Sequence, residues 1–200
     1  MRTRRLVSIA VFTALMIVGG WISVPVPFTP TKLSFQTLFA VTAGLLLGGR
    51  DGALAVLVYI AMGLIGLPVF TNGGGVGYVF MPSFGYLIGF VFGALLCGAV
   101  CSHLKHRTRG HVFLAALVGL VPVYAVGMTY QVLILYYYVG SAWAAALGGL
   151  PSIVVLAVKD AALCGLVASL YPSLSRAVGY RRGAATKSSR ADVNADPQYR

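Results

Sequence analysis

Long apolar runs separated by short polar breaks dominate the chain. The runs cover residues 6–23, 33–49, 52–68, 83–102, 112–138 and 150–171. Each is close to the roughly 20 residues that an α-helix needs to cross the hydrocarbon core of a bilayer. Strand-like alternation is absent, and a chain in lipid must satisfy its own backbone hydrogen bonds. The pattern predicts an all-α integral membrane protein with six transmembrane helices.

The fifth run is too long for one straight span. It contains Gly119, Pro122 and Gly127 and ends in three consecutive tyrosines, Tyr136–Tyr138. We expect tilt, a kink or an interfacial end in this segment.

The composition agrees with a membrane protein and excludes a basic nucleic-acid-binding domain. Of the 200 residues, 58% are hydrophobic and only 10% are charged, against about 25% charged in a typical soluble domain. The formal net charge is +11, but its basic residues lie mainly at the chain ends and in one short loop. Basic residues placed in this way are topology signals, so we expect no nucleic-acid partner. Cys97, Cys101 and Cys164 lie within apolar runs and are predicted to be buried.

The charge pattern predicts that both termini are cytoplasmic. Basic residues precede the first run, occur at Arg50, cluster in residues 105–109, and follow the sixth run. All these segments share one side of a six-span protein, and the positive-inside rule makes that side cytoplasmic. Trp21 and Trp143 lie near the opposite side, as interfacial anchors do. We predict a transmembrane domain over residues 1–175 and a disordered basic tail over 176–200.

Lys159 and Asp160 are the strongest candidates for chemistry. They lie inside the sixth apolar run, where an ionisable side chain costs about 2.5–3.5 kcal/mol at the bilayer centre. Adjacent helical positions point about 100° apart, so we do not expect a good mutual ion pair. The functional interpretation is that they bind different parts of a ligand. The alternative is that Lys159 extends to the interface while Asp160 pairs with a neighbouring helix.

Other polar groups in the runs are few. Gln36 opens the second run, and Tyr130 and Gln131 lie in the fifth. A buried amide at such a position either bridges helices or contacts a ligand. Lys32 is the only other basic residue that departs from the cytoplasmic pattern.

A glycine-rich segment, "TNGGGVGY", joins the third and fourth runs on the predicted outer side. Successive glycines allow backbone N–H groups to form a concave donor cluster. The segment is not a phosphate loop, since no Gly-Lys-Ser/Thr follows. The alternative is a flexible connector.

No catalytic group of residues stands out, so we do not expect an enzyme. His103, His106 and His111 have no carboxylates nearby in the sequence, and we expect no bound metal or cofactor. A structural membrane protein or a passive channel is the remaining alternative to ligand transport.

Four segments resemble the BioY family, the biotin-specific S-components of energy-coupling-factor (ECF) vitamin transporters. They are "PVPFTPTKLSFQTLF" (25–39), "GLIGLPVFTNGGGVGYVFMPSFGYLIGF" (63–90), "VYAVGMTY" (123–130) and "LPSIVVLAVKDAAL" (150–163). The second is the most specific. The resemblance implies a six-helix protein of a prokaryotic cytoplasmic membrane that captures biotin outside and delivers it inward. It also implies a transmembrane coupling subunit and two ATPase subunits as partners.

The resemblance also suggests which residues bind. Lys159 would suit the carboxylate of biotin and Asp160 the ureido N–H groups. The other implied ligand-binding residues are Gln36, Asn72, Gly73, Gly74, Gly75, Tyr78, Tyr86 and Tyr130. Ala10 and Ala14 share one face of the first helix and would dock on the coupling subunit. The family pattern has an acidic residue about one turn before the lysine, where this chain has Leu156. Alternatives are an S-component for riboflavin or thiamine, and a solitary biotin transporter.

Overall fold

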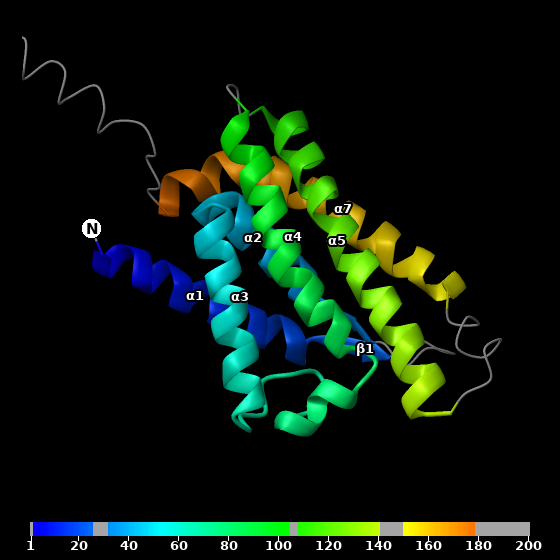
Figure 1. Ribbon diagram of the computed structural model, residues 1–200. Coiled ribbons are helices and arrows are strands. Elements are labelled where there is room, and N and C mark those ends of the chain that lie inside the picture. The colour runs from blue at the N-terminus through cyan, green and yellow to red at the C-terminus, as the bar shows by residue number, and fades with distance from the viewer. Residues whose placement is uncertain (1, 26–31, 105–107, 141–149, 179–200) are drawn as a thin grey trace, which may run out of the picture.

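Each apolar run folds as a helix in the computed structural model, which describes residues 2–25, 32–104, 108–140 and 150–178. The six α-helices of this part of the chain are α1 (Arg2–Trp21), α2 (Gln36–Leu47), α3 (Gly49–Leu64), α4 (Phe84–His103), α5 (Arg109–Leu133) and α7 (Leu150–Val178). α3, α4 and α5 run side by side, and α1 and α7 cross the bundle at an angle (Figure 1). The predicted all-α helical fold is confirmed. Trp143 and tail residues 179–200 lie outside the described residues.

The second helix is shorter than predicted, and the third begins and ends earlier than predicted. Four helices, α1, α4, α5 with its extension and α7, are long and apolar enough to cross a membrane by length and composition. α2 has 12 residues, about 18 Å of helix, and α3 has 16. Gly48 separates them with a φ of 88°, a left-handed conformation that glycine adopts without steric cost. α2 and α3 therefore form a tight helical hairpin.

A small antiparallel hairpin follows α1, which the apolar pattern did not predict. Strand β1 (Ser23–Pro25) pairs with β2 (Lys32–Ser34), and Ser23 faces Ser34. The predicted second span began at residue 33, but Leu33 belongs to this strand and the helix begins at Gln36. Two three-residue strands are too short to produce a detectable alternation of apolar and polar residues.

α4 is the central helix and packs on α2, α3 and α5. Its glycines Gly85, Gly89 and Gly93 recur every four residues along the face toward α5. A Cβ atom at Gly89 would lie 2.8 Å from Val123 Cα, and one at Gly93 would lie 2.7 Å from the Gly119 carbonyl oxygen. Small residues at this spacing allow the two helix backbones to approach closely.

The fifth helix has the irregular end that its length predicts. α5 contains Pro122 and passes directly into η2, a π-helical segment (Ile134–Tyr138). Tyr137 and Tyr138 at this end are exposed. The tyrosines thus lie in the irregular, exposed end of this helix.

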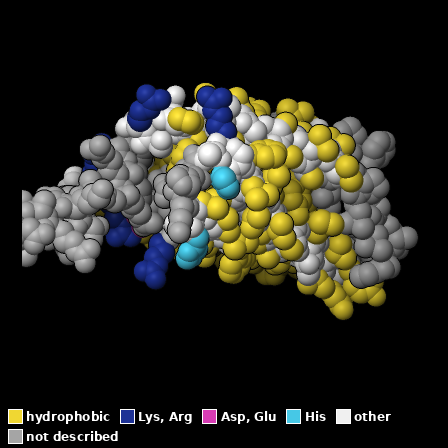
Figure 2. Space-filling model, turned by 90° about the horizontal axis from the view of Figure 1, so that it is seen from above, with side chains coloured by type: hydrophobic (Ala, Val, Ile, Leu, Met, Phe, Trp, Pro, Cys, Tyr) yellow, Lys and Arg dark blue, Asp and Glu magenta, His cyan; other side chains and the backbone are white. Residues whose placement is uncertain are grey.

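The two ends of the bundle differ in charge. The end with Arg5, Arg109 and the α2–α3 turn, here called the basic end, holds a bidentate ion pair between Arg5 and Asp51, with contacts of 2.9 and 2.5 Å. Asp51 is buried in the first turn of α3, where a negative charge also suits the helix dipole. In the view of Figure 2, Lys and Arg side chains gather toward one end, and apolar side chains cover much of the remaining surface. The opposite end, here called the loop end, carries β1, β2 and residues 65–83.

The apolar core has two parts. One cluster lies toward the basic end and contains Cys97, Cys101 and Cys164, all three buried as free thiols, as predicted. The other lies toward the loop end and is rich in aromatic side chains, among them Tyr59, Phe70 and Tyr78. The candidate site opens within this second cluster.

Candidate functional site

A polar pocket of about 40 Å³ lies among α2, α4, α5 and α7 and under the hairpin and the glycine-rich loop. Its lining residues are Lys32, Ser34, Gln36, Thr37, Thr71, Tyr78, Ser83, Tyr86, Leu87, Phe90, Val123, Tyr124, Leu156, Lys159 and Asp160. The pocket thus combines two ammonium groups, one carboxylate and several hydroxyl groups with an apolar wall. Buried polar groups of this kind cost free energy unless they are paired, so a cluster of them marks a ligand site.

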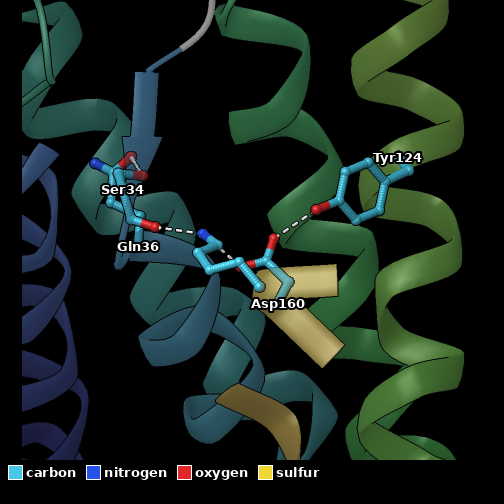
Figure 3. Close-up of polar contacts among 5 residues, drawn as sticks. Ser34, Gln36, Tyr124 and Asp160 are labelled. Carbon is cyan, nitrogen blue, oxygen red and sulfur yellow. Dashed lines mark hydrogen bonds and ion pairs between the residues drawn. The ribbon is translucent and has the colours of Figure 1, made fainter. Parts of the chain in front are cut away.

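Lys159 reaches across the pocket from α7 to the hairpin. Its Nζ donates a hydrogen bond to the Ser34 carbonyl oxygen at 2.7 Å (Figure 3). The same Nζ lies 2.6 Å from Asp160 Oδ1, and the two side chains are 18% and 4% exposed. The expectation of a poor mutual ion pair is therefore wrong. The flexible lysine stem bends back over its neighbour, which offsets the 100° between the two helical positions.

Asp160 is also bound by α5. Tyr124 donates its hydroxyl proton to Asp160 Oδ2 at 2.6 Å (Figure 3). Oδ1 has the ion pair with Lys159 as its contact and no hydrogen bond of good geometry within the described residues. One oxygen of this buried carboxylate, in a residue that lines the pocket, thus retains accepting capacity, because each carboxylate oxygen has two lone pairs.

Gln36 begins α2 beside the pocket and is held by α3. Its Nε2 donates to the Tyr59 hydroxyl, which donates in turn to the Val69 carbonyl oxygen at 3.2 Å. Ser34 Oγ lies 3.5 Å from Gln36 Oε1. This chain of bonds connects the hairpin, α2, α3 and Val69 just before the glycine-rich loop, so the amide bridges helices and also lines the pocket.

Two tyrosines supply the aromatic wall. Tyr78 comes from η1 (Val76–Phe80), and its hydroxyl lies 3.1 Å from Thr71 Oγ1 and accepts from Ser83 Oγ at 3.2 Å. Tyr86, from α4, donates to Gln131 Oε1 at 3.1 Å, and its ring meets that of Tyr124 edge to face. Both rings are therefore fixed in position before any ligand arrives.

The glycine-rich loop uses its amides internally. The Gly73 N–H donates to the Phe70 carbonyl oxygen at 3.2 Å, and the Gly75 N–H donates to the Gly63 carbonyl oxygen at 2.7 Å. Gly73 and Gly75 have φ near +105°, which only glycine adopts readily. These glycines therefore do not form the free cluster of three backbone N–H donors that the sequence suggested. They fold the loop against the end of α3, which brings the Thr71 and Tyr78 side chains to the pocket.

The structure brings together five of the ten ligand-binding residues expected from the sequence. Lys159, Asp160, Gln36, Tyr78 and Tyr86 line the pocket. The other five lie outside its lining: Asn72, Gly73, Gly74, Gly75 and Tyr130. Of these, Asn72 is exposed on the loop, and the Tyr130 hydroxyl donates to the Val79 carbonyl oxygen, which ties α5 to η1.

Sequence reasoning did not select Tyr124, Lys32, Ser34, Thr71 or Ser83. For two of them, Tyr124 and Lys32, the sequence contained a feature that could have indicated the site. Tyr124 precedes Gln131 by two helical turns on the same face of α5, and Lys32 departs from the cytoplasmic charge pattern. Ser34, Thr71 and Ser83 carry no such signal, because isolated hydroxyl residues near loops are common. Leu156, where the resemblance expected an acid, is buried and contributes to the apolar wall.

These features define a class of protein. A helical membrane bundle holds a buried polar pocket near one end, closed by a hairpin and a loop and containing both donors and acceptors. Within the described residues no group of three His, Cys, Asp or Glu side chains is placed to bind a metal. The pocket suits a small molecule that has an apolar body and polar groups of both hydrogen-bonding kinds.

Comparison with known proteins identifies the family. The sequence profile of the BioY family matches residues 1–180. The biotin transporter BioY of Rhizobium etli is 36% identical over 183 residues, 87% of this chain and 98% of the relative. A probable biotin transporter BioY of Lysinibacillus sphaericus is 48% identical over 128 residues, which are 64% of each chain. The chain therefore belongs to the BioY family.

A solved structure supports the same assignment at the level of the fold. The chain is similar to the S-component for biotin from an ECF-type ABC transporter, with a TM-score of 0.71 and 26% sequence identity. The match covers 86% of this chain and 92% of that one. The predicted S-component-like bundle is confirmed, and so is the expectation of a transport protein instead of an enzyme.

Proposed function

We propose that this chain binds biotin in the pocket and carries it across the cytoplasmic membrane as the substrate-binding S-component of an ECF-type transporter. The observation that carries the proposal is the buried Lys159–Asp160–Tyr124 group in a chain whose relatives are named biotin transporters. Biotin has a ureido group with two N–H donors and one carbonyl, an apolar thiophane ring and a carboxylate. The pocket offers a complement to each of these parts.

The roles of the lining residues follow from their chemistry. Asp160 suits the ureido N–H donors, since it lines the pocket and one of its carboxylate oxygens retains accepting capacity. Lys159 suits an acceptor, either the ureido carbonyl or the ligand carboxylate. Gln36, Tyr78 and Tyr86 supply polar edges and aromatic faces. The apolar side chains of Phe90, Val123 and Leu156 suit the thiophane ring. Asn72 and Gly73–Gly75 take part through the position of the loop.

The test is equilibrium binding of radiolabelled biotin to the purified protein. We expect saturable, high-affinity binding that excess unlabelled biotin displaces and that riboflavin and thiamine do not, because neither carries a cyclic urea of this size. Displacement by riboflavin or thiamine would assign the pocket to another vitamin. No saturable binding of any of the three would contradict the proposal.

The proposal includes a coupling subunit and two ATPase subunits as partners, since the described chain holds no nucleotide-binding loop. Ala10 and Ala14 would form part of the docking face on α1. Both are exposed, one turn apart, on the side of the helix away from the bundle. Transport of biotin by cells that express this chain without such partners would instead favour a solitary transporter.

We also propose that the loop end faces outward and that both termini are cytoplasmic, as the charge distribution predicts. Single cysteines at Asn72→Cys and Ser102→Cys test this orientation, since both positions are exposed and the native cysteines are buried. A membrane-impermeant maleimide added to intact cells is expected to label position 72 alone. Position 102 should react only after permeabilisation. The reverse pattern would contradict the orientation.

A further inference from the structure

Lys32 is the second ammonium group of the pocket, and it comes from β2 instead of a transmembrane helix. We propose that Lys32 binds the carboxylate of the ligand, while the Lys159–Asp160 pair holds the ureido ring. This inference rests on the proposed function, since it assigns one part of biotin to one residue.

The charge balance of the pocket favours Lys32 as the group that binds a carboxylate. Lys159 is neutralised by Asp160 at 2.6 Å. Lys32 donates from Nζ to the Thr71 carbonyl oxygen at 3.0 Å, a neutral partner. The described residues include only two acids, Asp51 and Asp160, and Asp51 pairs with Arg5 at the basic end. The described pocket therefore has one positive charge in excess, which a ligand with a single carboxylate would balance.

The position of Lys32 on β2 favours the same assignment. Lys32 precedes Ser34 by two residues, so both side chains lie on the same face of β2, and both line the pocket. The Ser34 carbonyl oxygen is the acceptor for Lys159. The Lys32 ammonium group donates to a carbonyl of the glycine-rich loop, whereas the Lys159 ammonium group donates to a carbonyl of β2, so the two groups have different partners around the pocket. A ligand with a polar ring at one end and a carboxylate at the other would engage one of these groups with each end.

The hydrogen bond between Lys32 and Thr71 also favours this assignment. Thr71 belongs to the glycine-rich loop, so the bond from Lys32 connects the hairpin to that loop over the pocket. The long lysine stem allows Nζ to turn from the Thr71 carbonyl to a carboxylate without backbone movement. A carboxylate bound there would contact both elements that cover the pocket, so ligand binding would hold them together.

The experiment compares biotin with biotin amide, in which a neutral amide replaces the carboxylate. We expect the wild-type chain to prefer biotin. Lys32→Gln is expected to lower the affinity for biotin by about tenfold to a hundredfold and to leave the affinity for biotin amide unchanged. Lys32→Arg should retain the preference. Arg109→Gln removes a charge from the exposed start of α5 and serves as the matched control, with both affinities as in wild type.

The remaining outcomes separate this inference from the proposed function. Equal weakening of both ligands by Lys32→Gln would show that Lys32 acts only by tying the hairpin to the loop, and would overturn the inference alone. An unchanged preference in Lys32→Gln, with the preference lost in Lys159→Ala, would assign the carboxylate to Lys159 and also overturn it. Absence of saturable biotin binding by the wild-type chain would overturn the proposed function and this inference together.

Discussion

Replacement of Lys159 with alanine is expected to lower the affinity for biotin by at least about a hundredfold. Lys159 is 18% exposed and contacts both the Ser34 carbonyl oxygen and Asp160, so its removal deletes the ammonium group at the centre of the pocket. Truncation of one member of a buried charged pair typically costs 2–5 kcal/mol, and each 1.4 kcal/mol is tenfold in affinity. Binding of labelled biotin to the purified variant measures the loss. Binding as tight as that of the wild type would contradict the assignment of this site.

A second variant separates binding from stability. Lys159→Ala alone leaves the Asp160 carboxylate, which is 4% exposed, without its cation, and such a change is strongly destabilising. The double variant Lys159→Met, Asp160→Asn removes both charges and retains the side-chain volume. We expect its thermal stability to exceed that of Lys159→Ala while biotin binding remains lost. Recovery of binding in the double variant would show that the pair serves only the fold.

Replacement of Gly74 with valine is expected to weaken biotin binding by at least about tenfold although Gly74 does not line the pocket. A Cβ atom at this position would lie 2.0 Å from the Leu67 carbonyl oxygen and 3.1 Å from that of Gly63. Backbone atoms cannot yield as a flexible side chain does, so the loop must move, at a typical cost of 1–3 kcal/mol. Thr71 and Tyr78 would move with it and lose their positions at the pocket.

Gly77 offers a matched control in the same loop. A Cβ atom at Gly77 meets nothing within 4 Å, so Gly77→Val adds the same side chain without a clash. We expect this variant to bind biotin as the wild type does. Measurements of biotin affinity and thermal unfolding on both variants complete the test. Equal affinities for the two variants and the wild type would return the glycine-rich loop to the role of a plain connector.

The organisation of the fold could be predicted from the sequence because it depends on local pattern. Lipid imposes helices on long apolar runs, so the number and order of the helices followed from hydropathy alone. Lengths were less predictable. Gly48, with its left-handed conformation, ends α2, and the strand Lys32–Ser34 delays its start; the strand depends on pairing with Ser23–Pro25, which an apolar run does not reveal.

From hydropathy and charge alone, the candidate site was predictable only for residues that are out of place in lipid, whereas Tyr78 and Tyr86 were selected through the family resemblance. Lys159 and Asp160 stood out because buried charge is costly, and both line the pocket. Tyr124 did not stand out, since a tyrosine within an apolar helix is common. Its role depends on Asp160, which lies 36 residues away on another helix.

The sequence by itself determined a six-helix membrane protein with one basic end and an ionisable pair inside its last helix. The tertiary structure alone decided the partner of each polar group. It joined Lys159 to a carbonyl 125 residues away, bound the Gly73 and Gly75 amides to carbonyls of Phe70 and α3, and placed Lys32 in the same pocket. The physical reason is that hydropathy and charge act residue by residue, whereas hydrogen bonds and ion pairs require atoms within about 3–4 Å. Only the packing of the helices brings such atoms together.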